Sequence, residues 1–325
     1  MFKGGNEMKH PEVSSIGIIG AGLIGGSLTV LTTGHGYKTV CVVRRPEMIP
    51  VYKEKYDTCF SQIIAQGLMP ANQREICEKY LHYAEDISAL KDCEIIFECV
   101  YEDLELKHEI YAKIEELCPN VRTVCSVSSS FTADMLTEKA TILKDKLIVA
   151  HPFNPPHMVL FFEICAGAET DSGVPAFAKE VLDTLNRKTV ILKKPAPGFI
   201  GNRLQAALWR EALYLVESGI CDARDVDTSL KYSFCPRYTS IGIFEHKDMG
   251  GLLLNQTVSN TIFPTLSNID KAPQAITDRV ERGDIGYRAE SMKGFYDWND
   301  VDMDAYLDRV NAPYWSHLDW DLPEE

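Results

Sequence analysis

The sequence is poor in basic residues, and this shortage limits the ligands that the protein can bind. It has 33 lysines and arginines against 47 aspartates and glutamates, which gives a formal net charge of −14 at pH 7. Such a surface repels the phosphates of nucleic acids and of anionic lipids. We therefore expect neither a nucleic acid nor a membrane surface as a partner.

The spacing of the cysteines excludes two further kinds of site. No Cys-x-x-Cys pair occurs among the ten, so the spacing indicates neither a zinc centre nor a redox dithiol. Several of them, such as Cys41, Cys99 and Cys125, fall in apolar runs, as small core residues do in a reducing compartment. Residues 1–12 also lack the apolar segment of a signal peptide. We therefore expect a cytoplasmic protein without a metal site.

Internal repeats and low-complexity segments are missing as well, and 325 residues are enough for two domains. In the first part of the chain, apolar strand-like runs alternate with helical segments. Strands are expected at residues 39–43, 93–99, 121–127, 147–150, 161–165 and 189–192, and helices at 47–80, 104–117 and 174–185. This alternation predicts an α/β fold with a Rossmann-type, doubly wound and mainly parallel sheet. Ligands of such a sheet lie at the carboxyl ends of its strands.

The pattern changes at a Lys-Lys-Pro-Ala-Pro-Gly stretch, residues 193–198, which is typical of a linker. Beyond it lies a helical periodicity over residues 199–218 and no convincing strand. We therefore divide the chain into a dinucleotide-binding domain, residues 1–195, and an all-helical C-terminal domain, residues 196–325. The second domain is expected to cap the substrate.

The most informative motif is a Gly-x-Gly-x-x-Gly turn between an apolar strand-like run and a helix. Gly20 permits the tight turn, Gly22 lets the backbone approach a pyrophosphate, and Gly25 lets helix and strand pack closely. The N–H groups at the start of the helix, at Leu23 and Ile24, then face the phosphates. The motif predicts a dinucleotide site, although glycine-rich turns of this kind also occur without a nucleotide.

Basic side chains stand where NAD-binding sites usually carry an acidic one. The strand at residues 39–43 is followed by Arg44 and Arg45, which cannot accept hydrogen bonds from the adenosine ribose hydroxyls. Two guanidiniums suit a 2′-phosphate instead. We therefore expect NADP as the favoured cofactor, with NAD as the second choice. The alternative interpretation of the pair is a solvated basic turn.

His151 and Glu163 are candidates for acid–base chemistry. His151 follows the strand at 147–150, and Glu163 lies inside the next apolar strand, where an ionisable residue is unexpected. A carboxylate bonded to one imidazole nitrogen sets the tautomer and raises the basicity of the ring. The alternatives are a purely structural pair, or a strand register that puts Glu163 in solvent.

Hydroxyl and amide groups gather at two further places. Ser126 and the cluster Ser128–Ser130 lie at the end of the strand at residues 121–127. Their hydroxyls either donate to a substrate oxygen or cap the following helix. Asn202 begins the long helix of the second domain, where it either completes the site or is an ordinary polar residue of the first turn.

Taken in chain order, these pieces resemble the L-3-hydroxyacyl-CoA dehydrogenase family, which includes the lambda-crystallin (gulonate dehydrogenase) branch. The matching pieces are the glycine turn, the serine cluster, the His-Pro-Phe-Asn-Pro-Pro stretch at 151–156, and the segments Glu98–Lys107, Pro197–Leu204 and Lys293–Tyr296. They keep the family order over nearly the whole chain. This makes the resemblance far more specific than any single motif.

The resemblance implies roles for the candidate residues. In such enzymes a histidine takes the hydroxyl proton while a hydride moves between substrate C3 and nicotinamide C4. His151 matches this acid/base, and Glu163 matches its orienting carboxylate. Ser129, or Ser128 after a one-residue shift, and Asn202 match the donors to the substrate oxygen.

The resemblance also has implications for the cofactor and for assembly. Glu102, Lys107 and Asn154 match positions that hold the nicotinamide end of the cofactor. Family members are commonly dimers through the helical domain, and this chain has an apolar helix face there that begins with Phe199 and Leu204. We therefore expect a homodimer.

Three functions remain open. The first is a dehydrogenase of 3-hydroxyacyl-CoA esters, which would reduce 3-ketoacyl-CoA in the reverse direction, and the second is a dehydrogenase of a free 3-hydroxy acid, sugar-acid or carnitine-like. The third is a nucleotide-binding, crystallin-like protein without catalysis, which the retention of His151, Glu163, Ser129 and Asn202 disfavours. Val127 stands where the acyl-CoA branch usually has Asn, and this departure puts the CoA ester in doubt.

Overall fold

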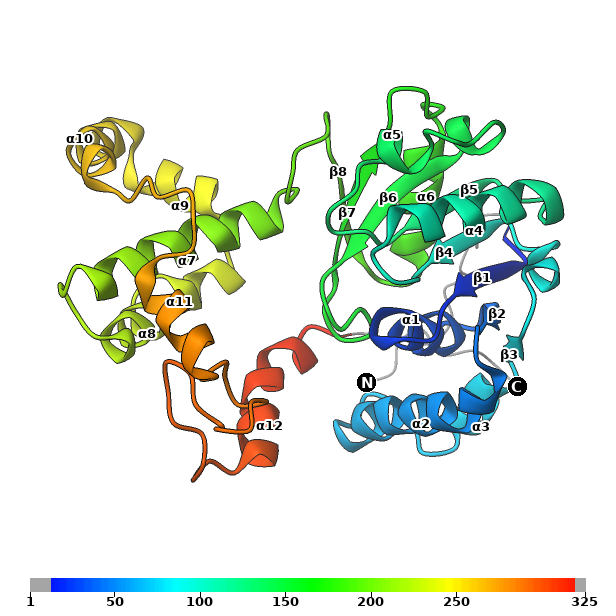
Figure 1. Ribbon diagram of the computed structural model, residues 1–325, viewed down its shortest axis with the longest axis horizontal. Coiled ribbons are helices and arrows are strands. Elements are labelled where there is room, and N and C mark those ends of the chain that lie inside the picture. Colours follow the sequence, from blue (N-terminus) through cyan, green and yellow to red (C-terminus); the bar gives the residue numbers. More distant parts are fainter. Residues whose placement is uncertain (1–12, 319–325) are drawn as a thin grey trace. The chain divides into compact units, whose positions relative to one another are not determined.

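The computed structural model describes residues 13–318, which form two compact units (Figure 1). The first unit contains residues 13–200 and 308–318, and the second contains Gly201–Leu307. The strands of the first unit are β1 (Ser15–Ile19), β2 (Lys38–Val42), β3 (Leu81–Ala84), β4 (Ile95–Glu98), β5 (Thr123–Ser126), β6 (Leu147–Pro152), β7 (Phe161–Ala166) and β8 (Lys188–Ile191). Its helices are α1 (Leu23–Gly34), α2 (Ile49–Ala65), α3 (Gln73–Glu78), α4 (Leu104–Leu117), α5 (Ala133–Leu136) and α6 (Val174–Thr184).

The strands form one sheet in the order β3-β2-β1-β4-β5-β6-β7-β8. All neighbouring strands run parallel except β6 and β7, which pair antiparallel. The predicted doubly wound, mainly parallel sheet is thus confirmed. The carboxyl ends of β1, β4 and β5 lie side by side, because Ile19 pairs with Glu98, and Glu98 pairs with Ser126. The side chains at these three ends therefore meet at one edge of the sheet.

Strand β3 is the strand that the apolar pattern does not predict, and the short helix α5 is not predicted either. Strand β3 lies at the edge of the sheet, and its four residues are only half-buried or exposed. A strand of this kind lacks the continuous apolar run that marks the central strands. The expected helical stretch at 47–80 is present as α2 and α3, on either side of a break at residues 66–72.

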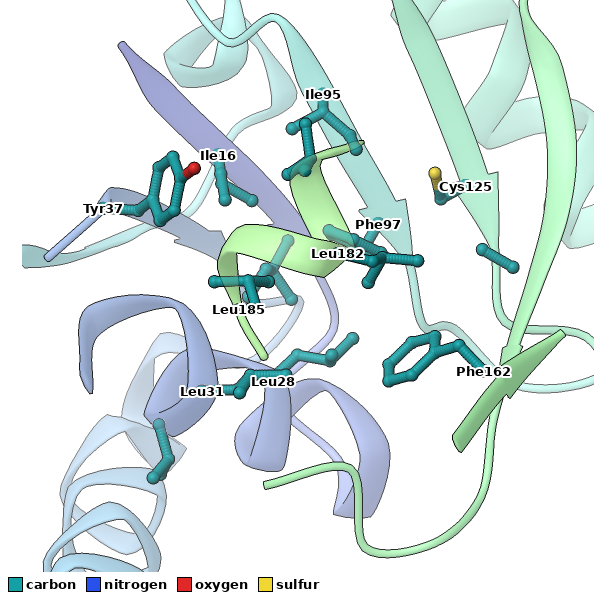
Figure 2. Packing of buried hydrophobic residues seen from close by; sticks show 14 of the residues in the cluster. Ile16, Leu28, Leu31, Tyr37, Ile95, Phe97, Cys125, Phe162, Leu182 and Leu185 are labelled. Atoms are coloured by element: carbon teal, nitrogen blue, oxygen red, sulfur yellow. The ribbon is translucent and has the colours of Figure 1, made fainter. Parts of the chain in front are cut away.

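Alternate residues of the strands pack into two apolar clusters, one on each face of the sheet. In β4, Ile95 and Phe97 belong to one cluster and Ile96 belongs to the other. The first cluster also contains Leu28 of α1 and Leu182 of α6 (Figure 2). The second cluster is completed by side chains of α4 and α5. Burial on both faces explains why these strands are continuous apolar runs in the sequence.

The second unit consists of helices connected by turns, as the sequence predicts. Its helices are α7 (Gly201–Glu217), α8 (Ala223–Tyr232), α9 (Ile243–Gly250), α10 (Leu252–Ile262), α11 (Gln274–Arg282) and the start of α12 (Met303–Trp315). Its interior is small, because Leu213 is the only apolar residue of Gly201–Leu307 that is fully buried.

The second unit is shorter than the expected domain of residues 196–325. Helix α12 begins in the second unit and ends in the first. Trp315 and Leu318 are buried in the first unit, in the cluster that contains Leu28. Residues 308–318 therefore belong to the first unit, because their apolar side chains are part of its core. Residues 319–325 lie outside the described range.

Two further expectations concern membranes and thiols. Within residues 13–318, no helix combines the length and the apolar character that crossing a bilayer requires. All ten cysteines fall in this range and are free. Burial raises the pKa of several of these thiols, for instance that of Cys41 to about 12. The thiols whose pKa is raised therefore stay protonated, and buried ones such as Cys41 and Cys125 pack as small core residues.

Candidate active site

The glycine turn joins β1 to α1 and has the geometry that a dinucleotide requires. Gly20 has a φ of +97°, which side chains rarely allow. A Cβ on Gly25 would lie 1.8 Å from the carbonyl oxygen of Gly20, so only glycine lets the helix approach the strand this closely. A Cβ on Gly22 would meet no described atom within 4 Å, and no side chain caps the start of α1. The N–H groups of Leu23 and Ile24 are therefore available to a phosphate.

Arg44 and Arg45 follow the carboxyl end of β2, next to this turn. Strand β2 is the neighbour of β1, and Val42 pairs with Ile19. Both arginines are exposed, and neither makes an ion pair or a side-chain hydrogen bond with another residue of the range 13–318. Two unpaired cations thus lie at the position from which this fold contacts the adenosine ribose of a dinucleotide.

His151 and Glu163 lie opposite each other in the antiparallel pair of β6 and β7. The Nδ1 atom of His151 is 3.4 Å from Oε2 of Glu163, at the long end of the hydrogen-bond range. The other carboxylate oxygen, Oε1, accepts the backbone N–H of Ile200 at 2.6 Å. Glu163 is completely buried, and His151 keeps 8% of its surface exposed. The register that would have put Glu163 in solvent is therefore excluded.

This contact defines which imidazole nitrogen is free for chemistry. With Nδ1–H donating to Glu163, the lone pair of Nε2 in His151 is left to accept a proton. The ring of Phe199 packs beside the imidazole, with centroids 5.3 Å apart, and limits its rotation. The geometry is that of a positioned general base, although its catalytic role remains a prediction.

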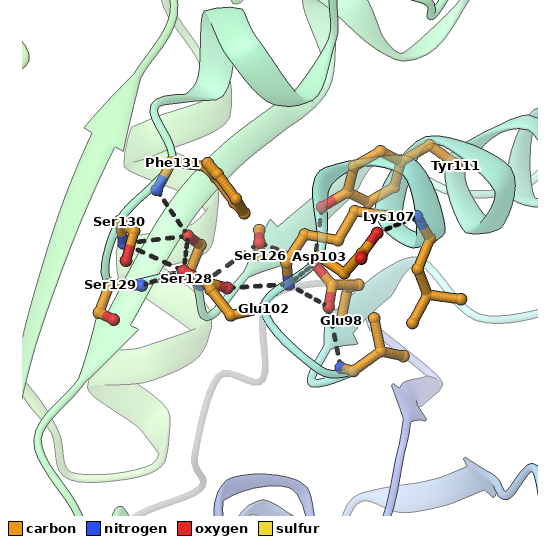
Figure 3. Close-up of polar contacts among 12 residues, drawn as sticks. Glu98, Glu102, Asp103, Lys107, Tyr111, Ser126, Ser128, Ser129, Ser130 and Phe131 are labelled. Atoms are coloured by element: carbon orange, nitrogen blue, oxygen red, sulfur yellow. Dashed lines mark hydrogen bonds and ion pairs between the residues drawn. The ribbon is translucent and has the colours of Figure 1, made fainter.

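A buried polar cluster lies at the carboxyl ends of β4 and β5 (Figure 3). At its centre is Glu98, whose carboxylate accepts hydrogen bonds from Lys107 Nζ at 2.8 and 3.0 Å. The hydroxyls of Tyr111 and Ser126 donate to Oε2 of the same carboxylate, at 2.6 and 2.7 Å. Burial, together with the charge of Glu98, raises the pKa of Tyr111, so this phenol stays protonated and acts as a donor.

Glu102 connects this cluster to the serine loop. Its Oε2 lies 3.4 Å from Nζ of Lys107. Its Oε1 accepts the hydroxyl of Ser128 at 2.5 Å and the backbone N–H groups of Ser129 and Ser130 at 3.2 and 3.1 Å. Partial burial alone would raise the pKa of Glu102, but these donors and the charge of Lys107 hold it below its usual value. The carboxylate is therefore ionised and fixes the loop.

The loop geometry distinguishes Ser128 from Ser129. The Ser128 hydroxyl is buried, donates to Glu102, and accepts the N–H of Phe131 at 2.8 Å. Ser129 is exposed, and its hydroxyl has no hydrogen-bond partner among the described residues. Ser128 is thus committed to the fold of the loop, and Ser129 remains available to a substrate.

Sequence reasoning missed the central residue of this cluster. Glu98 ends the apolar strand β4, and Ser126 ends β5 beside it. The signal in the sequence is the same as for Glu163, an ionisable residue at the end of a buried strand. Tyr111 carries no such signal, because an aromatic residue on the inner face of a helix is normally part of the core.

The two remaining predicted residues are placed separately. Asn154 is exposed in the loop after β6. Asn202 lies in the second unit, at the start of α7, where it lines a cavity of about 950 Å³ together with apolar side chains such as Trp209 and Phe295. The structure therefore brings together His151 with Glu163, and Lys107 with Glu102. It leaves Asn202 in a different unit.

A glycine turn of the dinucleotide-binding type and an imidazole in contact with a buried carboxylate lie at one edge of the doubly wound sheet, an arrangement that suits a nicotinamide-dependent dehydrogenase. A family model described as "3-hydroxyacyl-CoA dehydrogenase, NAD binding domain" matches residues 15–195. A second, described as "3-hydroxyacyl-CoA dehydrogenase, C-terminal domain", matches residues 198–298. The chain belongs to the 3-hydroxyacyl-CoA dehydrogenase family. The predicted family and enzyme class, an NAD(P)-dependent dehydrogenase of a 3-hydroxyacyl-CoA or 3-hydroxy acid, are thereby confirmed.

Individual relatives carry several different names. An L-carnitine dehydrogenase of Streptomyces coelicolor is 30% identical over 226 residues, which are 69% of each chain. A 5-formyl-3-hydroxy-2-methylpyridine 4-carboxylate 5-dehydrogenase of Mesorhizobium japonicum is 25% identical over 85% of this chain and 89% of its own. A solved structure of a 5-formyl-3-hydroxy-2-methylpyridine 4-carboxylic acid (FHMPC) 5-dehydrogenase, described as an NAD+ dependent dismutase, is similar in fold. The match covers 94% of this chain and 97% of that chain, with a TM-score of 0.83. At 24% sequence identity, this last likeness concerns the fold alone.

Proposed function

We propose that this enzyme transfers a hydride between a nicotinamide cofactor and C3 of a free 3-hydroxy acid. The observation that carries the proposal is the contact of His151 Nδ1 with the buried Glu163 carboxylate, which leaves Nε2 as a base at the carboxyl edge of the sheet. The dinucleotide supplies a hydride acceptor or donor when it is bound.

His151 and the polar donors have complementary tasks in each direction. In oxidation, Nε2 of His151 takes the hydroxyl proton while the C3–H bond breaks and its electron pair leaves with the hydrogen as a hydride, so that a ketone forms. In reduction, the protonated imidazole returns this proton to the developing alkoxide. Ser129 donates a hydrogen bond to the same oxygen.

The choice of a free acid over a CoA ester is supported by the charges on α2 and α3. Few cations lie there, and two of them are already paired. Lys53 contacts Glu78 at 2.8 Å, and Arg74 contacts Asp57 at 2.6 Å. A CoA nucleotide would have to compete with these carboxylates for its phosphates. The names of the relatives, L-carnitine and pyridine-carboxylate dehydrogenases, also point to free carboxylic acids.

NADP is the proposed cofactor of choice, because Arg44 and Arg45 are exposed and unpaired beside the glycine turn. A guanidinium pair suits the two negative charges of a 2′-phosphate. The alternative interpretation is that both side chains stay in solvent and that cofactor choice is set elsewhere.

A homodimer through the second unit is the proposed assembly. A helical unit with one fully buried apolar residue has too little core to be stable by itself. Apolar side chains exposed on it include Leu204, Phe244, Met249, Leu252, Leu253 and Phe263. A second copy with C2 symmetry is the commonest way to cover such a surface. Phe199, expected on this face, is instead buried in the first unit beside His151.

We also retain the cytoplasmic location in the proposal. The ten free cysteines support it, because thiols persist in reducing compartments.

A substrate screen tests the proposal. Purified enzyme is assayed with NADPH and NADH against acetoacetyl-CoA and a panel of free 3-keto acids, among them the ketone derived from carnitine. We expect turnover of at least one free acid with a higher kcat/KM than acetoacetyl-CoA. Turnover restricted to the CoA ester would restore the acyl-CoA function. Cofactor binding without turnover of any compound would favour the non-catalytic, crystallin-like function.

A further inference from the structure

Glu98 is completely buried at the carboxyl end of β4, directly opposite Ile19, the residue that precedes the glycine turn. We propose that Glu98 is a positioning residue, whose charge fixes Lys107 and, through Lys107 and Glu102, the serine loop and the affinity for the oxidised cofactor. This inference rests on the proposed function, taken with the family resemblance, which implies that Glu102 and Lys107 hold the nicotinamide end of the dinucleotide.

The Glu98 carboxylate has no spare acceptor site. Lys107 donates to both oxygens, Tyr111 and Ser126 donate to Oε2, and the backbone N–H of Val100 donates to Oε1 at 2.9 Å. All of its partners are donors, so a neutral amide cannot replace the carboxylate without turning its own N–H₂ group toward them. Its orientation is therefore fixed, and so is that of the Lys107 ammonium.

The charged groups of the cluster form a row that runs from the buried Glu98 through Lys107 to the partly exposed Glu102. Lys107 is fully buried between the buried Glu98 and Glu102, whose side chain is 33% exposed. The carboxylates of Glu98 and Glu102 and the ammonium of Lys107 together carry a net charge of −1. Without Glu98, Glu102 would be the only anion in contact with the ammonium. Its hold on the N–H groups of Ser129 and Ser130 would then change.

A net negative charge beside the nicotinamide has a definite consequence. The oxidised ring carries a positive charge and the reduced ring is neutral, so the cluster stabilises the bound oxidised form selectively. A residue that served only to fold the protein would change the affinity for both forms equally. The ratio of the two dissociation constants therefore separates a positioning role from a structural one.

The test measures dissociation constants of Glu98→Gln for the oxidised and the reduced cofactor by fluorescence titration, together with the thermal midpoint, kcat and KM. We expect the dissociation constant of the oxidised form to rise at least about threefold more than that of the reduced form, because one charge is removed close to the ring. We also expect kcat to fall more than KM changes, because the serine loop is less well fixed.

The matched control is Glu115→Gln on α4, the helix that carries Lys107. Glu115 accepts the backbone N–H groups of Thr141, Ile142 and Leu143 at 2.8, 2.5 and 2.7 Å, away from the glycine turn. Its replacement removes the same charge and should lower the thermal midpoint without changing the ratio of dissociation constants. The inference is overturned if Glu98→Gln leaves the ratio of the two dissociation constants unchanged, or if Glu115→Gln changes that ratio equally.

If the Glu98→Gln variant does not fold, the Tyr111→Phe variant tests the inference instead. It removes one donor to Glu98 and leaves the charge and the shape of the site. We expect kcat to fall severalfold with the ratio of dissociation constants preserved, and an unchanged kcat contradicts the inference. If the wild-type protein binds neither form of the cofactor, the proposed function fails first. That result is distinguishable from a failure of the Glu98 variants alone.

Discussion

Glu163 faces His151 across the antiparallel pair of β6 and β7, and its Oε2 contacts the imidazole Nδ1 at 3.4 Å. This relationship depends on strand register, because a shift by one residue would turn Glu163 to the other face of the sheet. The same carboxylate accepts the N–H of Ile200, so it also fixes the last residue before the chain enters the second unit.

Replacing the base should abolish most of the activity. For His151→Ala we expect turnover to fall by about two to four decades, the usual scale for a general acid–base group, with cofactor binding unchanged. Steady-state kinetics and a cofactor titration measure the two effects. His82→Ala, at an exposed position of β3, is the control and should keep full activity. Near-normal turnover in His151→Ala would refute the mechanism.

The two neighbouring serines should behave differently. Ser129→Ala removes an exposed hydroxyl, so we expect kcat to fall by about tenfold or more with the thermal midpoint unchanged. Ser128→Ala removes the hydroxyl that joins Glu102 to the N–H of Phe131, so we expect a loss of about 1 kcal/mol in the free energy of unfolding. Kinetics and urea unfolding of both variants distinguish them. Equal behaviour would contradict the assignment of Ser129 to the substrate.

Cofactor preference should follow the arginine pair. A hydrogen bond to a charged group contributes about 1.5–3 kcal/mol, so one engaged arginine gives about ten- to more than hundredfold preference for NADPH over NADH. Arg44→Asp should supply an acceptor for the ribose hydroxyls and repel the 2′-phosphate, and so reverse the preference. The measurement is kcat/KM with both cofactors in wild type and variant. If the wild type favours NADH, or if Arg44→Asp leaves the ratio of kcat/KM for NADPH to kcat/KM for NADH unchanged, the arginines do not select the cofactor.

Stability should fall in mildly acidic solution because of His157. Burial, together with the charge of Arg187, lowers the pKa of His157 to about 4. Its backbone N–H donates to the Ser27 hydroxyl at 2.8 Å, and the same hydroxyl lies 2.7 Å from Nδ1, so the imidazole is held in a buried position that disfavours its charged form. The unfolded chain, with a pKa near 6.5, takes up the proton first as the pH falls.

The free energy of unfolding should therefore be highest above pH 6.5 and fall by about 3 kcal/mol as the pH drops to about 4. Urea unfolding across this window, compared between wild type and the non-titrating His157→Gln, measures the effect. The exposed His82→Gln serves as the control and should keep the wild-type slope. Parallel pH profiles for wild type and His157→Gln would contradict the prediction.

Assembly should depend on the exposed apolar residues of the second unit. We expect light scattering at micromolar concentration to report twice the chain mass of 36.5 kDa. Leu253→Glu, on α10, should convert the dimer to monomers, because it places a charge in the interface. Ile142→Glu, an equally drastic change at an exposed apolar residue of the first unit, is the control. A wild-type monomer would refute the dimer.

Much of the first unit could be predicted from the sequence because its signals are local. The glycines of the turn are required by backbone geometry within a few residues, as the φ of Gly20 and the close approach at Gly25 show. The central strands are buried on both faces, so each appears as an apolar run without reference to its neighbours. His151 and Glu163 stand out for the same reason, as ionisable residues in or beside such runs.

The remainder required the tertiary structure, because it depends on which side chains meet across elements. Glu98 and Ser126 are 28 positions apart in the chain, and the pairing of β4 with β5 makes them hydrogen-bond partners. The different tasks of Ser128 and Ser129 follow from the direction in which one carboxylate, Glu102, approaches the loop. The sequence alone thus determined the fold class and the glycine turn, and it singled out His151 and Glu163 as candidates. The tertiary structure decided which charged groups meet in the buried network around Glu98. It also decided that Ser129 is the serine whose hydroxyl stays free, and that residues 308–318 pack in the first unit. These features depend on long-range contacts, which leave no periodic pattern in the sequence.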